Sequence, residues 1–222
     1  MQFRNFFLIF SGEIRGFGEA HKLYGKLDWK TLLEPVIELA RNGFKVPEEL
    51  GKRLEAHSEF ILSDKGLSET FSRDGKVFVK GEIVKRENLA KTLHKIAEEG
   101  SDAFYSGEIA DSLIDSINKN GGIMTKSDFA DYKVQISDAI ETYYRGYRIL
   151  TSGTPTSGHM LVQTLNILEG FDLPKEKKSS LNVHRFVESL KHGFASRTIL
   201  GDTNFVITFN IRSKLLRSSL SL

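Results

Sequence analysis

The residues with the clearest spacing for metal chemistry lie near the C-terminal end of the chain. His184, Glu188 and His192 follow one another at intervals of four residues, so on a helix they would lie along one face. Imidazole and carboxylate groups arranged in this way can hold a divalent metal ion. The zinc-protease pattern also requires a glutamate next to the first of two histidines, and that pattern is absent. The spacing therefore favours a solvated helix face over a metal site.

A loop serine is the candidate nucleophile. Ser157 and His159 stand between an expected strand and an expected helix, a position where nucleophiles often occur. The Gly-x-Ser-x-Gly elbow is not matched, because Thr156 precedes the serine and His159 lies where the second glycine would be. Backbone amides at such a helix start could bind an anion. A capped helix start is the simpler interpretation.

Three glycines near the start invite comparison with a phosphate-binding loop. Gly16 and Gly18 follow Gly12, but His21 occupies the position where the dinucleotide fingerprint needs another glycine. This spacing favours a tight turn into a short helix.

Acidic residues in the middle of the chain could in principle act as acid and base. Asp131, Asp138 and Glu141 are close in sequence, but spacing alone is a weak signal. Residue types and spacing therefore assign no catalytic, substrate-binding or metal-binding residue.

The composition narrows the possible classes of protein. The 222 residues contain no cysteine, which excludes disulfides, iron–sulfur clusters and thiolate catalysis. A net charge of +2 gives no indication of nucleic-acid binding. The apolar run Phe6–Phe10 is shorter than the roughly 7–15 residues of a signal-peptide core, and no run approaches the roughly 20 residues of a membrane span. We expect no signal or anchor, and the compartment stays open.

Most of the chain has helical periodicity, with glycines closing the apolar runs. Asp28 is expected to cap a short turn, and Pro35 is expected to begin a separate helix that Gly43 ends. The expected helices lie at about 36–42, 48–61, 86–99, 109–119, 160–169 and 181–200. The inward face of the first should comprise Val36, Ile37, Leu39 and Ala40. The last has an apolar stripe of Val183, Phe186, Val187, Leu190 and Phe194.

Shorter signals predict two hairpins and a helix cap. Asp74-Gly75 is typical of a hairpin turn. After Tyr132 the apolar period changes to alternation, which predicts a strand pair within 134–150 that turns near Arg145-Gly146. Thr125 and Asp128 have the spacing of a capping box.

Several segments together resemble the γ-glutamyltransferases, also called glutathione hydrolases. They occur in the family's order over about residues 11–205 and comprise Gly12–Gly16, His21, Tyr24–Trp29, Pro35–Phe44, Gly100–Gly107, Gly121–Thr125, Tyr144–Tyr147, Pro155–Gly158, Leu165–Gly170 and Leu200–Asp202. The resemblance implies part of the layered αββα fold of N-terminal-nucleophile hydrolases. It also implies a precursor that cuts itself into a heavy and a light chain. The light chain's new N-terminal threonine then attacks the γ-glutamyl amide of glutathione or related compounds. No metal or organic cofactor is implied.

The sequence departs from the family pattern at both ends. The resemblance covers only the middle and end of the heavy chain, and neither the carboxylate-binding arginine segment nor the Thr-Thr/Ser-His nucleophile motif has a counterpart. The nearest string is Thr156–His159, which lies elsewhere and contains an extra glycine. No catalytic or substrate-binding residue is therefore carried over from the family, and we expect glutathione not to be processed by this chain.

The expected fold class is α+β, a mainly helical fragment with one strand pair. The expected organisation is an atypical apolar start at 1–10, a partial heavy-chain region at 11–205 and a divergent basic tail at 206–222. Surfaces that pack on other parts in the family should expose apolar side chains here. Three interpretations stay open: a truncated, inactive family member, a non-catalytic partner chain that binds a light chain or a full-length relative, or an unstable fragment without a biological role.

Overall fold

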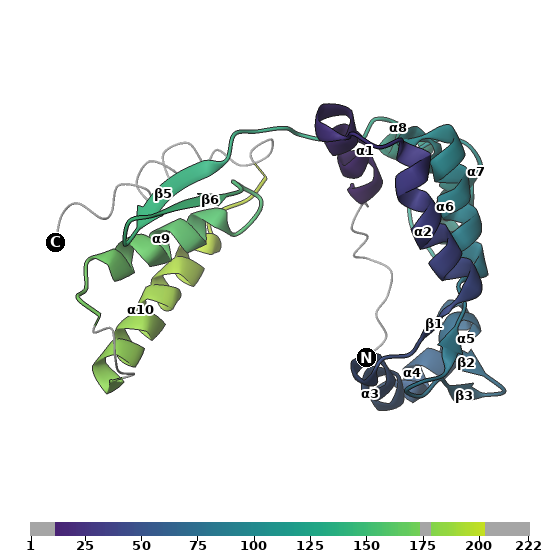
Figure 1. The fold of residues 1–222 in the computed structure, drawn as a ribbon, viewed down its shortest axis with the longest axis horizontal. Coiled ribbons are helices and arrows are strands. Elements are labelled where there is room, and N and C mark those ends of the chain that lie inside the picture. The colour runs from purple at the N-terminus through teal and green to yellow at the C-terminus, as the bar shows by residue number, and fades with distance from the viewer. Residues whose placement is uncertain (1–11, 174–178, 203–222) are drawn as a thin grey trace. The chain divides into compact units, whose positions relative to one another are not determined.

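The computed structural model describes residues 12–173 and 179–202 (Figure 1). These residues fall into two compact units that divide between Val134 and Gln135, close to the change of periodicity after Tyr132. The expected apolar start at 1–10 and the basic tail at 206–222 lie outside the described residues.

The first unit is mostly helical. Its longer helices are α1 (Glu13–Tyr24), α2 (Trp29–Asn42), α3 (Glu48–Ala56), α6 (Glu87–Glu99) and α7 (Glu108–Lys119). Shorter elements connect them: β1 (Phe44–Lys45), α4 (Ser58–Ser63), α5 (Lys65–Phe71), β2 (Ser72–Arg73), β3 (Lys76–Val77), β4 (Ile83–Val84), η1 (Ser101–Phe104) and α8 (Lys126–Ala130).

Helices α2 and α6 lie side by side and share one small core (Figure 1). Ile37 and Ala40 from α2 pack against Ala90 and Ala97 from α6. The expectation for the inward face of α2 was wrong in part, because its Val36 and Leu39 are exposed.

The expected break at Pro35 is also wrong, since α2 continues through it from Trp29 to Asn42. Proline removes one backbone hydrogen bond inside a helix. We attribute the continuity of α2 to its packing on α6 and to its end signals. Asp28 accepts hydrogen bonds from the amides of Lys30 and Thr31 at the N-terminus, and Gly43 adopts φ +91° after the C-terminus.

A second core lies where the chain folds into short elements. Strands β1 and β4 pair antiparallel, and Val46, Leu54, Ile61, Phe78 and Val84 form the buried cluster beside them. The predicted turn at Asp74-Gly75 joins β2 to β3, with both residues in the left-handed region. The helix expected over 48–61 is interrupted at His57, which separates α3 from α4.

The third core of this unit gathers α1, η1, α7 and α8. Tyr105, Ala110, Ile114 and Phe129 are its buried members. The predicted capping box is present, because Thr125 and Asp128 each bond the other's backbone amide at the start of α8. Arg15 of α1 extends into this cluster, and its guanidinium lies 4.1 Å from the centre of the Tyr105 ring.

The second unit consists of a hairpin and two helices. Strands β5 (Ile140–Tyr144) and β6 (Tyr147–Thr151) pair antiparallel and turn at Arg145-Gly146, as predicted. The strand is shorter than expected, because Val134 and Ile136 have no strand partner and precede β5 as irregular chain. Helix α9 (Gly158–Glu169) packs on the hairpin and on α10 (Ser180–Arg197).

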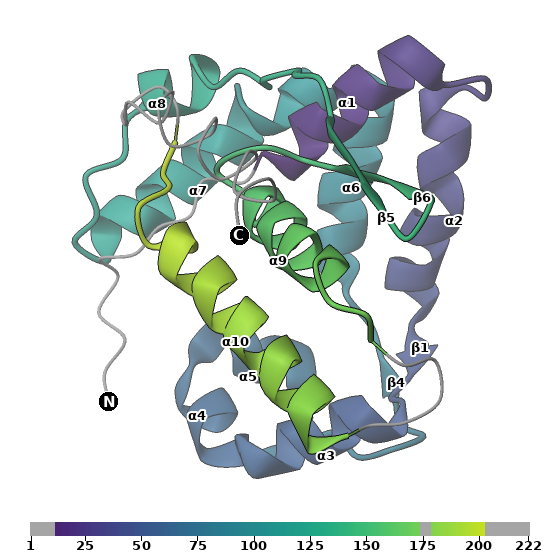
Figure 2. The same ribbon diagram turned by 90° about the vertical axis from the view of Figure 1, so that its left-hand side faces the viewer.

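Helices α9 and α10 lie side by side (Figure 2), and Gly193 is one of the residues at their contact. Gly193 approaches α9 so closely that an added Cβ would lie 2.6 Å from Thr164 Oγ1. Four members of the expected apolar stripe of α10 are exposed, namely Val183, Phe186, Val187 and Phe194, whereas Leu190 is half-buried.

These features agree with the expected class, a mainly helical fragment with small strand pairs. Within the part of the chain that the structure describes, no helix combines the length and apolar character of a membrane span.

Candidate functional site

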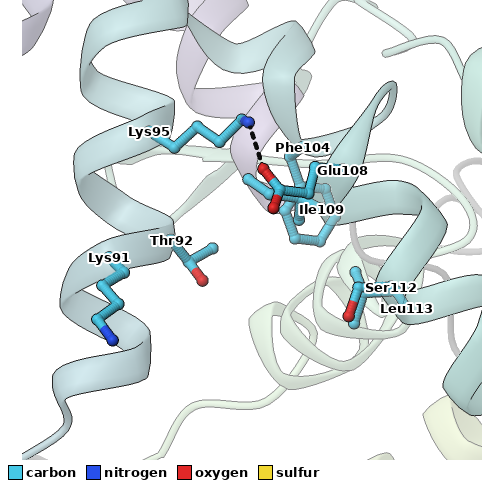
Figure 3. Close-up of a pocket in the computed structure, with 8 residues that line it drawn as sticks. All are labelled: Lys91, Thr92, Lys95, Phe104, Glu108, Ile109, Ser112 and Leu113. Carbon is cyan, nitrogen blue, oxygen red and sulfur yellow. Dashed lines mark hydrogen bonds and ion pairs between the residues drawn. The ribbon is translucent and has the colours of Figure 1, made fainter.

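One candidate site in the described ranges is a cleft between α6 and α7, which we call the α6–α7 cleft (Figure 3). Its volume is about 340 Å³, which lies within the size range of small-molecule pockets. Eight residues line it: Lys91, Thr92, Lys95, Phe104, Glu108, Ile109, Ser112 and Leu113.

Local sequence explains how these side chains reach the cleft. On α6, Lys91 and Lys95 are four residues apart and therefore lie one turn from each other on the same face. On α7, Ile109 and Leu113 have the same spacing. The turn η1 joins the two helices and places Phe104 between them.

Charged side chains stand at the rim of the cleft. Lys95 Nζ lies 2.8 Å from Glu108 Oε2 across the cleft, which Figure 3 marks as a dashed line. Hydrogen bonding to Glu108 raises the pKa of Lys95, and the same bond lowers the pKa of Glu108. Lys95 also lies 3.7 Å from Glu99. Lys91 makes no ion pair among the residues that the structure describes.

The candidate nucleophile, Ser157, lies immediately before the first residue of α9. Ser157 precedes α9 and makes no capping hydrogen bond, whereas the Thr156 hydroxyl lies 3.4 Å from the Gly158 amide. Gly158 is required here, because an added Cβ would lie 1.8 Å from the Ser152 carbonyl oxygen. His159, the next residue, is buried with 1% exposure.

His184 and His192 are exposed on α10 and Glu188 between them is half-buried, in agreement with the solvated interpretation. The Glu188 carboxylate bonds Lys191 Nζ at 2.8 Å, and this bond is the main cause of its lowered pKa. In the described ranges, no group of three or more histidine or acidic side chains could hold a metal ion.

The three glycines near the start do not form a phosphate loop. Gly12 precedes α1, and Gly16 and Gly18 lie inside that helix. Gly18 serves close packing, because an added Cβ would lie 2.5 Å from the hydroxyl oxygen of Ser101. The helix expected after Gly12 is present, but Gly16 and Gly18 lie within it and do not form a turn.

Of the three acidic residues suggested as acid and base, Glu141 is engaged by neighbouring side chains of the hairpin. The Glu141 carboxylate accepts hydrogen bonds from Arg148 at 2.6 Å and from the Tyr143 hydroxyl at 3.0 Å. These bonds lower its pKa, so the group is a cross-strand ion pair of the hairpin.

Sequence reasoning did not predict the α6–α7 cleft. The available signal was the pair Lys91 and Lys95 on one helix together with Ile109 and Leu113 on the next. That spacing does not predict that a cleft separates the two helices, because their relative orientation depends on η1.

Comparison with known proteins identifies the relatives of this chain. A γ-glutamyltranspeptidase family model matches residues 10–221. Glutathione hydrolase 3 of Arabidopsis thaliana is 40% identical over 207 residues, which make up 92% of this chain and 32% of the relative. Glutathione hydrolase 2 of the same plant is 42% identical over 196 residues, with 88% and 34% coverage. The chain thus spans about a third of the length of these relatives.

The fold comparison agrees. The crystal structure of Helicobacter pylori γ-glutamyltranspeptidase superposes with a TM-score of 0.88 at 31% identity, covering 94% of this chain and 60% of that one. The match extends over both units of the chain. The ordered segments, the family model and this shared fold together establish that the chain belongs to the γ-glutamyltranspeptidase family.

Proposed function

We propose that this chain provides the mostly helical middle and end of the heavy chain of a γ-glutamyl acyltransferase. Such an enzyme would transfer the γ-glutamyl group of glutathione to water, an amino acid or a dipeptide. The observation that carries this proposal is the match over 92% of the chain to a glutathione hydrolase of which it covers 32%.

We propose further that these 222 residues do not perform the reaction alone. Acyl transfer needs a nucleophile next to a base. Among the described residues, no hydrogen bond joins the Ser157 hydroxyl to an imidazole or a carboxylate. The sequence also contains no counterpart of the family's Thr-Thr/Ser-His nucleophile motif.

The test is an assay with a chromogenic γ-glutamyl anilide as donor and a dipeptide as acceptor. The purified chain should release no product above the blank, while a full-length glutathione hydrolase under the same conditions should. Adding a light chain from a relative should not restore turnover, because the segment that carries the carboxylate-binding arginine has no counterpart here. Product release that is lost in Ser157→Ala would refute the proposal and identify that loop as the site. If product release persists in Ser157→Ala, contaminating host enzyme must first be removed. Product release that remains after this removal would also refute the proposal.

A second candidate function is that of a non-catalytic partner chain. The exposed stripe of α10, formed by Val183, Phe186, Val187 and Phe194, favours it because such surfaces usually mark contacts. Co-purification with a co-expressed light chain would support this function. A monodisperse monomer that does not bind the light chain would count against the partner function.

A further inference from the structure

The chain between α8 and β5 lacks the bonds that hold other connections in place. Residues 133–139, which we call the 133–139 segment, contain no helix or strand (Figure 1). None of them forms a hydrogen bond or an ion pair with another residue that the structure describes. Residues 135–139 are all exposed, and Ile136 is 68% exposed. A partner can therefore reach this backbone without unfolding the chain.

Both ends of the 133–139 segment are fixed. The Tyr132 ring stacks on Tyr105 with the ring centres 5.7 Å apart, and the Tyr132 carbonyl accepts a hydrogen bond from Arg15. Ile140 pairs with Thr151 at the start of β5. The backbone between these ends can extend over at most about 25 Å. An endoprotease that holds roughly six substrate residues as an extended strand needs about 20 Å, so the segment is long enough.

Exposure alone does not distinguish the 133–139 segment from other surface chain. Ile123 is 92% exposed, more than Ile136. Its neighbours are tied, however, because the Gly122 amide donates to the Ile117 carbonyl at 3.0 Å and the Met124 carbonyl accepts from a side-chain amide of α7 at 2.8 Å. A protease that requires an extended backbone can bind at Ile123 only after such bonds break.

We propose that the 133–139 segment is a processing site, at which an endoprotease that binds its substrate as an extended strand cuts the chain. Hydrogen bonds between the two main chains supply the affinity, as in other complexes formed by strand addition. Val134 and Ile136 are two residues apart, so an extended segment presents both aliphatic side chains on one side, to an apolar subsite. This cut is independent of γ-glutamyl transfer. It also differs from the self-cleavage that the family resemblance implies, because an external protease makes it.

The reaction is the hydrolysis of a peptide bond, for example that between Ser137 and Asp138. The oxygen of a water molecule adds to the carbonyl carbon of Ser137, and the bond from this carbon to the Asp138 nitrogen breaks. The nitrogen leaves with a proton, so the products are a carboxylate on Ser137 and an amino group on Asp138. Water is the only co-reactant, and nothing is oxidised or reduced.

The experiment treats the full 222-residue chain, in separate samples, with two endoproteases of unrelated specificity. Asp-N cuts before aspartate, and every aspartate of the chain lies among the described residues. Thermolysin cuts before bulky apolar residues. Mass spectrometry identifies each new N-terminus over time. Among the described residues, Asp-N should cut first before Asp138, and thermolysin should cut first before Val134 or Ile136.

Two exposed positions serve as internal controls, Ile123 for thermolysin and Asp74 for Asp-N. Asp74 lies at the exposed turn between the paired strands β2 and β3. Cutting at either control requires local opening, so it should be at least about 10-fold slower than cutting in the 133–139 segment. Urea below the unfolding transition should accelerate cutting at the controls and leave cutting before Asp138 unchanged, because that bond needs no opening.

Three variants make the test specific. Asp138→Asn should abolish the Asp-N cut in the 133–139 segment, whereas Asp74→Asn should leave its rate unchanged. Ile136→Ser should remove the thermolysin cut before residue 136 and keep the Asp-N rate within about 2-fold, because accessible backbone defines the site. The proposal is overturned if the first Asp-N cut falls at another aspartate, if thermolysin cuts before Ile123 as fast as before Ile136, or if cutting before Asp138 requires urea.

Discussion

We expect the Arg15 side chain to make the strongest polar contacts between α1 and the rest of the first unit. Its guanidinium stacks on Tyr105 at 4.1 Å, donates to the Tyr132 carbonyl, and lies 3.2 Å from the Asp102 carboxylate. The side chain is only 16% exposed, while the Asp102 side chain is 79% exposed. The strong contacts are therefore those to the ring and the carbonyl.

The expected loss in Arg15→Gln follows from these contacts. A partly desolvated cation–π contact contributes about 1–2 kcal/mol, and a hydrogen bond from a charged donor about 1.5–3 kcal/mol. The exposed pair with Asp102 adds about 0–1 kcal/mol. Because glutamine can recover one hydrogen bond, we expect the free energy of unfolding to fall by about 2–4 kcal/mol. With a urea dependence of about 2 kcal/mol per molar, the midpoint should move by about 1–2 M.

The assay can follow this unit alone, because the chain contains a single tryptophan. Trp29 begins α2 and donates its indole N–H to the Ile96 carbonyl at 3.0 Å, so its fluorescence should report unfolding of the α2–α6 contact. Arg53→Gln is the matched control, since Arg53 pairs with Glu49 but both side chains are over 70% exposed. Its midpoint should move by an amount corresponding to less than about 0.5 kcal/mol.

Partner substitutions distinguish the contacts. Asp102→Asn should cost less than about 1 kcal/mol. In a double-mutant cycle, Arg15→Gln and Tyr105→Leu should couple by about 1 kcal/mol or more. Equal midpoint shifts for Arg15→Gln and Arg53→Gln would refute this reasoning.

Two further predictions concern helix packing and capping. Gly193→Leu should destabilise the second unit by about 1–3 kcal/mol, because the new side chain meets Thr164 at the α9–α10 contact. Faster amide exchange in both helices would report this loss. Gly170→Ala is the control: its added Cβ would lie 3.4 Å from the Ile167 carbonyl oxygen, and amide exchange should stay unchanged. At the start of α8, hydrogen bonds from Thr125 lower the pKa of Asp128 below its ordinary value of 3.8. The stabilisation of α8 by the Asp128 carboxylate is therefore present above pH 3.8 and is lost as the pH falls through the lowered pKa of the folded state. Asp128→Asn should remove that acid dependence from the amide exchange of α8, and an unchanged dependence would contradict the assignment.

Local chemistry allowed most of the turns and helix ends to be predicted from the sequence. Gly43 and Gly100 follow helices with positive φ, and Asp74-Gly75 and Arg145-Gly146 form the predicted turns. The Thr125 cap involves only neighbours within a few residues. Such features depend on backbone sterics and short-range hydrogen bonds, which the residue types largely determine.

The candidate site was not predictable in the same way. Its lining comes from α6, η1 and α7, and the opening between the helices depends on how η1 directs them. The sequence interpretation placed its candidates at Ser157 and along His184–His192, where the structure shows a helix start and a solvated face. Residue spacing along one helix carries no information about the separation of two helices.

The sequence by itself determined the family and the mainly helical class, because ordered local segments are sufficient for both. Tertiary structure alone decided which faces are buried. On α2, Ile37 is buried and Val36 is exposed although the two are adjacent and both apolar, because α6 covers only one side of the helix. Burial depends on which neighbour is present, and that neighbour comes from a distant part of the chain.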